Sequence, residues 1–181
     1  MLDSNLITQQ TKNWILSFII PLQICPFASY VIDNQTIQFN VSNALTLEDA
    51  LADLNREIDY LNHHQAIETS LVIFPNLFAE FFTYLDFIDL AEEQIIAANY
   101  EGIYQFATFH PNYCFADATG PEDVANYTNR SPHPMVHILR EDSVEKAIAF
   151  YGNTEQIPAN NIALLHSLGL EKIKALLSKV M

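Results

Sequence analysis

Residues 46–75, TLEDALADLNREIDYLNHHQAIETSLVIFP, decide the fold expected for this chain. Thr46 followed by Asp49 is typical of a helix start, and leucine or isoleucine then recurs every three or four residues, at positions 47, 51, 54, 58 and 61. The short apolar run Leu71–Phe74, closed by Pro75, is typical of a strand buried on both faces. A helix that leads into a buried strand indicates a crossover unit of an α/β fold.

The flanking sequence extends this pattern in both directions. Strands are predicted at 37–41, 103–109 and 135–140, and helices at 8–20, 78–99 and 143–151, with two short helices at the C-terminus. Two crossover units follow from this order. We therefore predict one domain over residues 1–181, α/β (or α+β), with a mixed sheet of about four to five strands covered by helices and a helical C-terminus.

Composition indicates which partners and which cellular location to expect. The chain has 22 acidic and 8 basic residues, a formal charge of −14, which disfavours nucleic acid and anionic membrane surfaces as partners. Only two cysteines occur, the longest apolar stretch (residues 14–27) is interrupted by polar residues and a proline, and the N-terminus lacks the basic region of a signal peptide. These features predict a soluble, cytoplasmic protein with reduced thiols.

The segment from Pro111 to Pro134 shows no clear periodicity. Structureless loops of this length in a compact domain are usually functional or disordered, and the aromatic and apolar content of this one favours order. His110 stands at the end of the strand before the loop. Because ligands of open α/β sheets gather at the carboxyl ends of strands, we expect the functional site here.

Three separated motifs carry a resemblance to a known family: Cys25-Pro26-Phe27-Ala28, Phe109-His110-Pro111-Asn112-Tyr113, and residues 126–135 (NYTNRSPHPM). Together they resemble a bacterial domain-of-unknown-function family, number fourteen-fifteen, over nearly the whole chain. The resemblance implies a family and no activity. Cys114 departs from the family, where glutamine is common at this position, which speaks against a Cys25–Cys114 disulfide.

Within the loop, Arg130 is the first candidate for binding a substrate. A guanidinium fork among short polar groups can clamp a carboxylate or a phosphate through two hydrogen bonds. Asn126, Tyr127 and Asn129 come shortly before it in the sequence and are further candidates for binding the substrate. The competing interpretation is an ion pair that fastens the loop to an acidic helix.

His110 is the candidate general acid or base, with Asp89 or Asp86 of the preceding helix orienting it. We take Phe78, Phe81, Phe82, Leu85, Ile88 and Ile96 as the apolar face of that helix, which places Asp89 and Glu92 within the face. In the other account the helix leaves the sheet after Leu85 and these acids lie in water. The leading hypothesis is thus an enzyme acting on a small anionic metabolite.

Two other classes remain open. The first is a noncatalytic ligand-binding or protein-interaction module, in which the loop only shapes a surface. A metal site would use His110 and His133 with a third ligand such as Cys25 or a carboxylate, although no familiar ligand spacing is present. His137 shares a strand face with Met135 and Leu139 and is expected to be a core or half-buried histidine. Cofactor, substrate, reaction and oligomeric state are left open, and the four glycines form no phosphate-binding loop.

Overall fold

The structure is a computed structural model that describes residues 3–178. Its core is a four-stranded sheet in the order β1-β2-β4-β3. The strands are β1 (Ile37–Val41), β2 (Thr69–Ile73), β3 (Tyr104–Phe109) and β4 (Met135–Arg140). β1 and β2 are parallel, and β4 runs antiparallel to β2 and to β3. The predicted mixed α/β sheet is confirmed.

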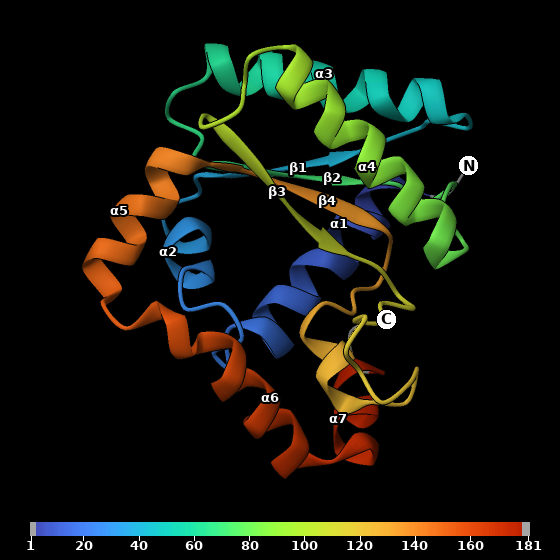
Figure 1. Cartoon of the computed structure of the whole chain (residues 1–181), viewed down its shortest axis with the longest axis vertical. Coiled ribbons are helices and arrows are strands. Elements are labelled where there is room, and N and C mark those ends of the chain that lie inside the picture. Colours follow the sequence, from blue (N-terminus) through green and yellow to red (C-terminus); the bar gives the residue numbers. More distant parts are fainter. Residues whose placement is uncertain (1–2, 179–181) are drawn as a thin grey trace.

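Helices cover both faces of this sheet (Figure 1). They are α1 (Ser4–Trp14), the π-helix η1 (Ile15–Ile19), α2 (Ala28–Asp33), α3 (Leu47–His63), α4 (Phe81–Ala97), the 3-10 helix η2 (Val124–Thr128), α5 (Glu141–Tyr151), the 3-10 helix η3 (Thr154–Gln156), α6 (Ile157–Leu168) and α7 (Leu170–Leu177). The crossover helices α3 and α4 lie on one face, and α1 lies beneath the other (Figure 1). Among residues 3–178, no helix is both long and apolar enough to cross a membrane.

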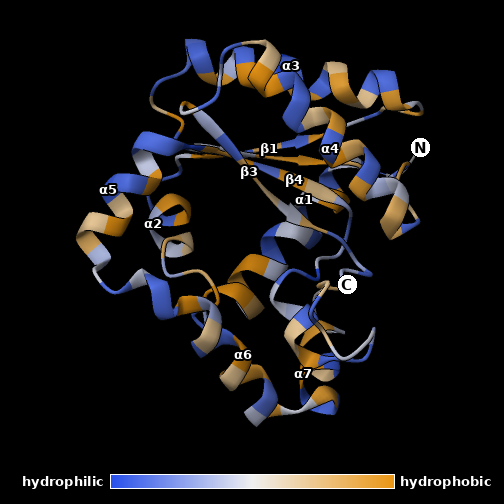
Figure 2. Ribbon diagram, in the orientation of Figure 1, coloured by the Kyte–Doolittle hydropathy of each residue, from blue (hydrophilic) through white to orange (hydrophobic). Residues whose placement is uncertain are grey.

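Two hydrophobic cores result, one on each face of the sheet. Val72 of β2 joins the core beneath α3 and α4, whereas Leu71 and Ile73 join the core of α1, η1, α6 and α7. Every residue of β2 is buried, as the apolar run predicts. β4 is largely orange in Figure 2, whereas blue and orange stretches alternate in α3.

The strand directions place three loops at the same end of the sheet, beyond the carboxyl ends of β1, β2 and β3. β3 runs parallel to β1 and β2, because both β2 and β3 are antiparallel to β4. The loops that follow these three strands, residues 42–46, 74–80 and 110–134, therefore start at the same end of the sheet. Ligand sites of α/β sheets are usually found at the carboxyl ends of the strands.

The N-terminal helix differs from its prediction over residues 8–20. It begins at Ser4, because the side chain of Asp3 accepts the N–H of Asn5 at 2.9 Å and caps the helix. After Trp14 it continues as the π-helix η1 to Ile19. The motif at residues 25–28 leads into α2, a six-residue helix without a buried residue, which apolar periodicity did not predict.

The apolar face predicted for α4 is correct only in part: Phe78 and Ile88 are buried, and Phe81 and Leu85 are partly buried against the core. The buried residues are Tyr84, Phe87, Ile88, Ala91 and Ile95. Phe82 and Ile96, which we placed in the core, are 79% and 58% exposed. Large apolar residues surround this helix on all sides, so hydropathy alone does not determine which face turns inward. Phe78 precedes the helix and adopts a left-handed conformation with φ of 61°.

Candidate functional site

His110 is fully buried at the end of β3, between the rings of Phe81 and Tyr84. Its Nε2–H donates to the carbonyl of Phe78 at 2.7 Å, and its Nδ1 accepts the N–H of Asn112 at 2.9 Å. This pattern assigns the proton to Nε2 of a neutral ring. Burial lowers the pKa of His110, against the opposing effects of the Phe78 carbonyl and Glu80. Both ring nitrogens are thus engaged with the backbone.

Arg130 closes the long loop on itself. Its Nε donates to the carbonyl of Tyr113 at 3.1 Å, and its Nη2 donates to the carbonyl of Pro121 at 2.5 Å. The guanidinium also lies over the ring of Tyr127, 4.5 Å from the ring centre. These contacts hold two distant parts of the loop together, and the fork is not turned toward an acidic helix.

The amides of the loop have similar roles. Asn126 is fully buried; its Oδ1 accepts the N–H of Phe115 at 2.9 Å and its Nδ2 donates to the carbonyl of Gly120 at 2.9 Å. Asn129 donates from Nδ2 to the carbonyl of Thr108 at 3.0 Å. The structure thus gathers the predicted substrate-binding residues in one place, where their polar groups mainly bind the loop's own backbone.

Asp86 and Asp89 lie elsewhere. Both side chains are exposed on α4, as is Glu92. Within the described chain, no hydrogen bond or ion pair joins either aspartate to His110 or Arg130. These acids therefore lie in water, although α4 does not leave the sheet after Leu85, because Phe87, Ile88, Ala91 and Ile95 are buried.

The residues of the metal alternative are also held by other groups. Nε2 of His133 lies 2.9 Å from Oε1 of Gln10 in α1, on the face of the sheet opposite to that of His110. Burial raises the pKa of the Cys25 thiol, opposed by the backbone N–H groups of Phe27 and Ala28. Over residues 3–178, no group of three or more His, Cys, Asp or Glu is arranged to hold a metal ion.

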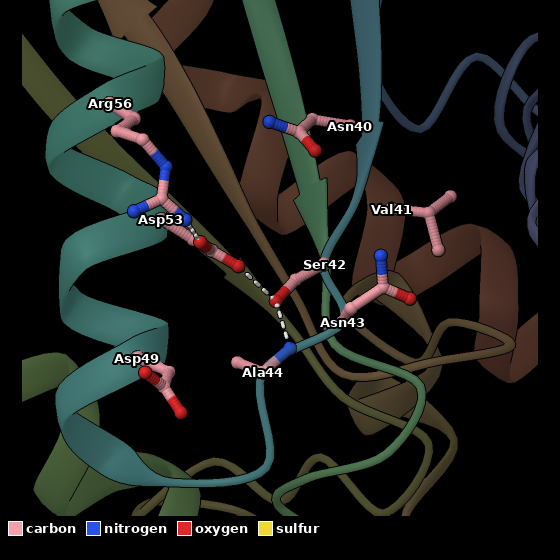
Figure 3. A pocket seen from close by; sticks show the side chains of 8 residues that line it. All are labelled: Asn40, Val41, Ser42, Asn43, Ala44, Asp49, Asp53 and Arg56. Carbon is pink, nitrogen blue, oxygen red and sulfur yellow. Dashed lines mark hydrogen bonds and ion pairs between the residues drawn. The ribbon is translucent and has the colours of Figure 1, made fainter. Parts of the chain in front are cut away.

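A polar hollow opens beside β1, at the carboxyl end of the strand, and faces the first half of α3 (Figure 3). It has a volume of about 360 Å³ and is lined by Asn40, Val41, Ser42, Asn43, Ala44, Asp49, Asp53 and Arg56. The end of β1 and the loop residues 42–44 form one wall, and α3 forms the other (Figure 3). The size lies within the range of small-molecule sites, roughly 300–1,000 Å³.

Ser42 and Asp53 join the two walls. The hydroxyl of Ser42 donates to Oδ2 of Asp53 at 2.5 Å and accepts the N–H of Ala44 at 3.0 Å. Oδ1 of Asp53 forms an ion pair with Arg56 (Figure 3). Asp49 lies one turn before Asp53, near the start of the helix, where its Oδ2 accepts the hydroxyl of Thr46 at 2.7 Å.

A buried carboxylate lies behind the hollow. Glu57 is 4% exposed, although it belongs to a crossover helix packed on a sheet. Its Oε2 accepts Nδ2 of Asn40 at 2.5 Å and its Oε1 accepts the hydroxyl of Ser70 at 2.5 Å. No ion pair with a cation forms at Glu57 anywhere in the described chain. Asn40 therefore connects this carboxylate to the wall of the hollow.

Sequence reasoning missed this site. The acids at positions 49, 53 and 57 recur every four residues of α3, next to its apolar face, and Asn40 and Ser42 alternate with the apolar residues of β1. Each pattern alone is typical of a solvent-exposed face. Only the crossover that lays α3 over β1 turns the two polar rows toward each other.

The fold and the hollow define a mixed α/β domain with a polar site at the carboxyl end of a parallel strand. The chain belongs to the family described as protein of unknown function DUF1415, whose model matches residues 6–175. The family suggested by the three sequence motifs is thereby confirmed. No match was found among curated proteins or among solved structures.

Proposed function

We propose that this protein is a noncatalytic binding protein that takes a small polar molecule into the hollow beside β1. The observation that carries the proposal is the buried Glu57, whose partners among residues 3–178 are the neutral donors Asn40 and Ser70. A buried carboxylate is costly, and packing α3 on the sheet requires only apolar residues. Small-molecule sites commonly place a few buried polar groups of this kind next to a cavity.

The charges of the hollow favour a ligand with a positive group. Arg56 is the only cation in the wall, and it is already paired with Asp53. Asp49 is exposed, and the hydroxyl of Thr46 leaves it free to accept further hydrogen bonds. A ligand with an ammonium group near Asp49 and hydroxyl or amide groups near Asn43 and Asn40 could form hydrogen bonds with these side chains.

Binding fits these contacts better than catalysis. The hollow is lined by neither histidine nor cysteine, and Ser42 donates to a carboxylate already paired with arginine. His110 and Arg130 hold the long loop through their own hydrogen bonds. An enzyme acting on an anionic metabolite through these two residues stays a prediction.

The test is calorimetric titration of the full chain with a panel of small amines, amino acids and carboxylic acids. Asp49→Asn removes one carboxylate of the hollow, and Asp86→Asn removes one exposed carboxylate of α4 as the matched control. We expect an amine to bind the wild type and the control, and to bind Asp49→Asn on the order of tenfold more weakly. Equal binding by both variants, or binding of anions alone, would contradict the proposal.

A further inference from the structure

The outer edge of β1 is open along its whole length. In the described part of the chain β1 pairs with β2 alone, and its even-numbered residues direct their backbone groups to that neighbour. The carbonyl of Thr36 accepts the N–H of Thr69, and the N–H of Ser42 donates to the carbonyl of Ile73 at 2.8 Å. Backbone groups of successive strand residues alternate in direction. The N–H and C=O groups of Ile37, Phe39 and Val41 therefore point away from the sheet.

The opposite edge of the sheet, β3, is closed at both ends. The N–H of Tyr104 donates to the carbonyl of Tyr100 at 3.1 Å, and the carbonyl of Thr108 accepts Nδ2 of Asn129 at 3.0 Å. Chain segments next to β3 thus occupy the outward groups at its two ends. β1 has no such closure within the described residues.

Within β1 itself the usual protection of an edge strand is missing, although Lys12 of α1 lies next to the strand, with its Nζ over the Phe39 ring at 5.0 Å from the ring centre. Its sequence, IQFNV, contains no charge and no proline, and residues 34–47 carry no charged side chain in a chain of net charge −14. Edge strands of monomeric proteins commonly use lysine, proline or a bulge to prevent pairing. At this edge two strongly acidic copies can approach each other with few like charges face to face.

We propose that β1 docks against β1 of a second copy of this chain, antiparallel and about a twofold axis at Phe39. In this register Phe39 lies opposite Phe39 of the partner subunit, and Ile37 lies opposite Val41 of the partner subunit. All outward-facing residues then occupy hydrogen-bonded positions, so each outward N–H meets a carbonyl. The interface is self-complementary, as a twofold dimer requires, and joins two four-stranded sheets into one.

This inference does not rest on the proposed ligand, although the two features touch. Asn40 and Val41 belong to β1 and also line the hollow. Pairing through β1 would therefore order one wall of the binding site in each copy.

The test compares two glutamines, one on each edge strand. Gln38→Lys places like charges on both sides of the proposed twofold axis, and Gln105→Lys makes the same change in β3. Sedimentation velocity over a range of concentrations should show a dimer for the wild type and for Gln105→Lys. Gln38→Lys should associate on the order of tenfold more weakly.

Amide hydrogen exchange gives a second readout on the same samples. The amides of Ile37, Phe39 and Val41 should exchange more slowly as the wild-type concentration rises, and should stay fast in Gln38→Lys. A monomeric wild type would overturn the proposal and leave the edge to solvent or to an extended segment of another protein. A dimer that withstands Gln38→Lys, or that both variants weaken equally, would overturn it as well.

Discussion

His110 satisfies two backbone groups at once, the carbonyl of Phe78 and the N–H of Asn112. Removing a partner of a buried polar group costs about 1–3 kcal/mol, and the cavity left by the ring adds to this. His110→Ala should therefore lower the free energy of unfolding by about 2–5 kcal/mol in urea titrations. His63→Ala, at an exposed position of α3, should change it little. Equal stability of the two variants would refute the structural role of His110.

Buried histidines should make the protein less stable in mild acid. Burial lowers the pKa of His110 and His133, and lowers that of His137, whose Nε2 lies 2.6 Å from the hydroxyl of Thr69, to about 4. The folded chain therefore binds protons less readily than the unfolded chain, so stability is complete above about pH 6.5 and falls as the pH drops toward 4.

Urea unfolding at about pH 7 and about pH 5 measures this effect in a window where few carboxylates titrate. Each histidine can contribute up to about 1.4 kcal/mol per pH unit. The difference between the two pH values should shrink in His137→Asn. A difference as large as that of the wild type would show that His137 is not a source of the acid sensitivity.

Single residues could be predicted from sequence only where their neighbours are local. Thr46 caps α3 through its contact with Asp49, as expected from their spacing. Phe78, which accepts from His110, and the carbonyls that accept from Arg130 lie far away in sequence, so the two residue types suggested chemistry while their contacts hold the backbone.

At the scale of elements, Tyr84 joins α4 to the ends of two strands. Its buried hydroxyl donates to the carbonyl of Met135 in β4 at 2.8 Å and accepts the N–H of Phe109 in β3 at 3.2 Å. Tyr84→Phe leaves both backbone groups buried without this partner and should cost about 2–4 kcal/mol of unfolding free energy. Tyr30→Phe, at a position 60% exposed, is the matched control. A cost no larger than that of the control would contradict this role.

The long loop should open when its guanidinium is lost. Arg130→Lys keeps a positive charge but cannot reproduce the fork that reaches the carbonyls of Tyr113 and Pro121. We expect faster amide exchange and faster proteolysis between residues 111 and 130 than in the wild type. Lys146→Arg, on the exposed side of α5, should have no such effect. Unchanged exchange in Arg130→Lys would show that the loop does not depend on these bonds.

The buried face of a helix could be predicted where the helix has a single apolar stripe, and could not be predicted where apolar residues lie on more than one side. α3 has one apolar stripe, and Leu54, Ile58 and Leu61 are buried as expected. The direction of α4 had to be set by the tertiary contacts of Tyr84 and Phe87, because apolar residues surround it. Helix α2 is too short and too exposed to leave a periodic signal.

At the scale of the whole molecule, the net charge of −14 works against the compact state. Salt screens this repulsion over about 10 Å at 0.1 M ionic strength. Thermal unfolding in sodium chloride should therefore occur at higher temperature as the salt concentration rises. A midpoint that falls with salt would show that attractive ion pairs outweigh the net repulsion.

A mixed sheet covered by helices followed from the order of elements, but the strand order and the hollow did not. Right-handed crossovers and a mixed sheet are general consequences of alternating strands and helices. The hollow arises where two polar rows, one on β1 and one on α3, meet across that crossover. Each row resembles a solvent-facing surface until the packing of α3 is known.

The central claim is that the hollow beside β1 is the binding site. Its most direct test is a residue-resolved map of amide chemical shifts, recorded while the amine found by calorimetry is titrated into the full chain. We predict that the amides of Ser42, Asn43 and Ala44 shift first and saturate together. Shifts confined instead to His110 and residues 128–131 would contradict the claim and place the ligand in the long loop.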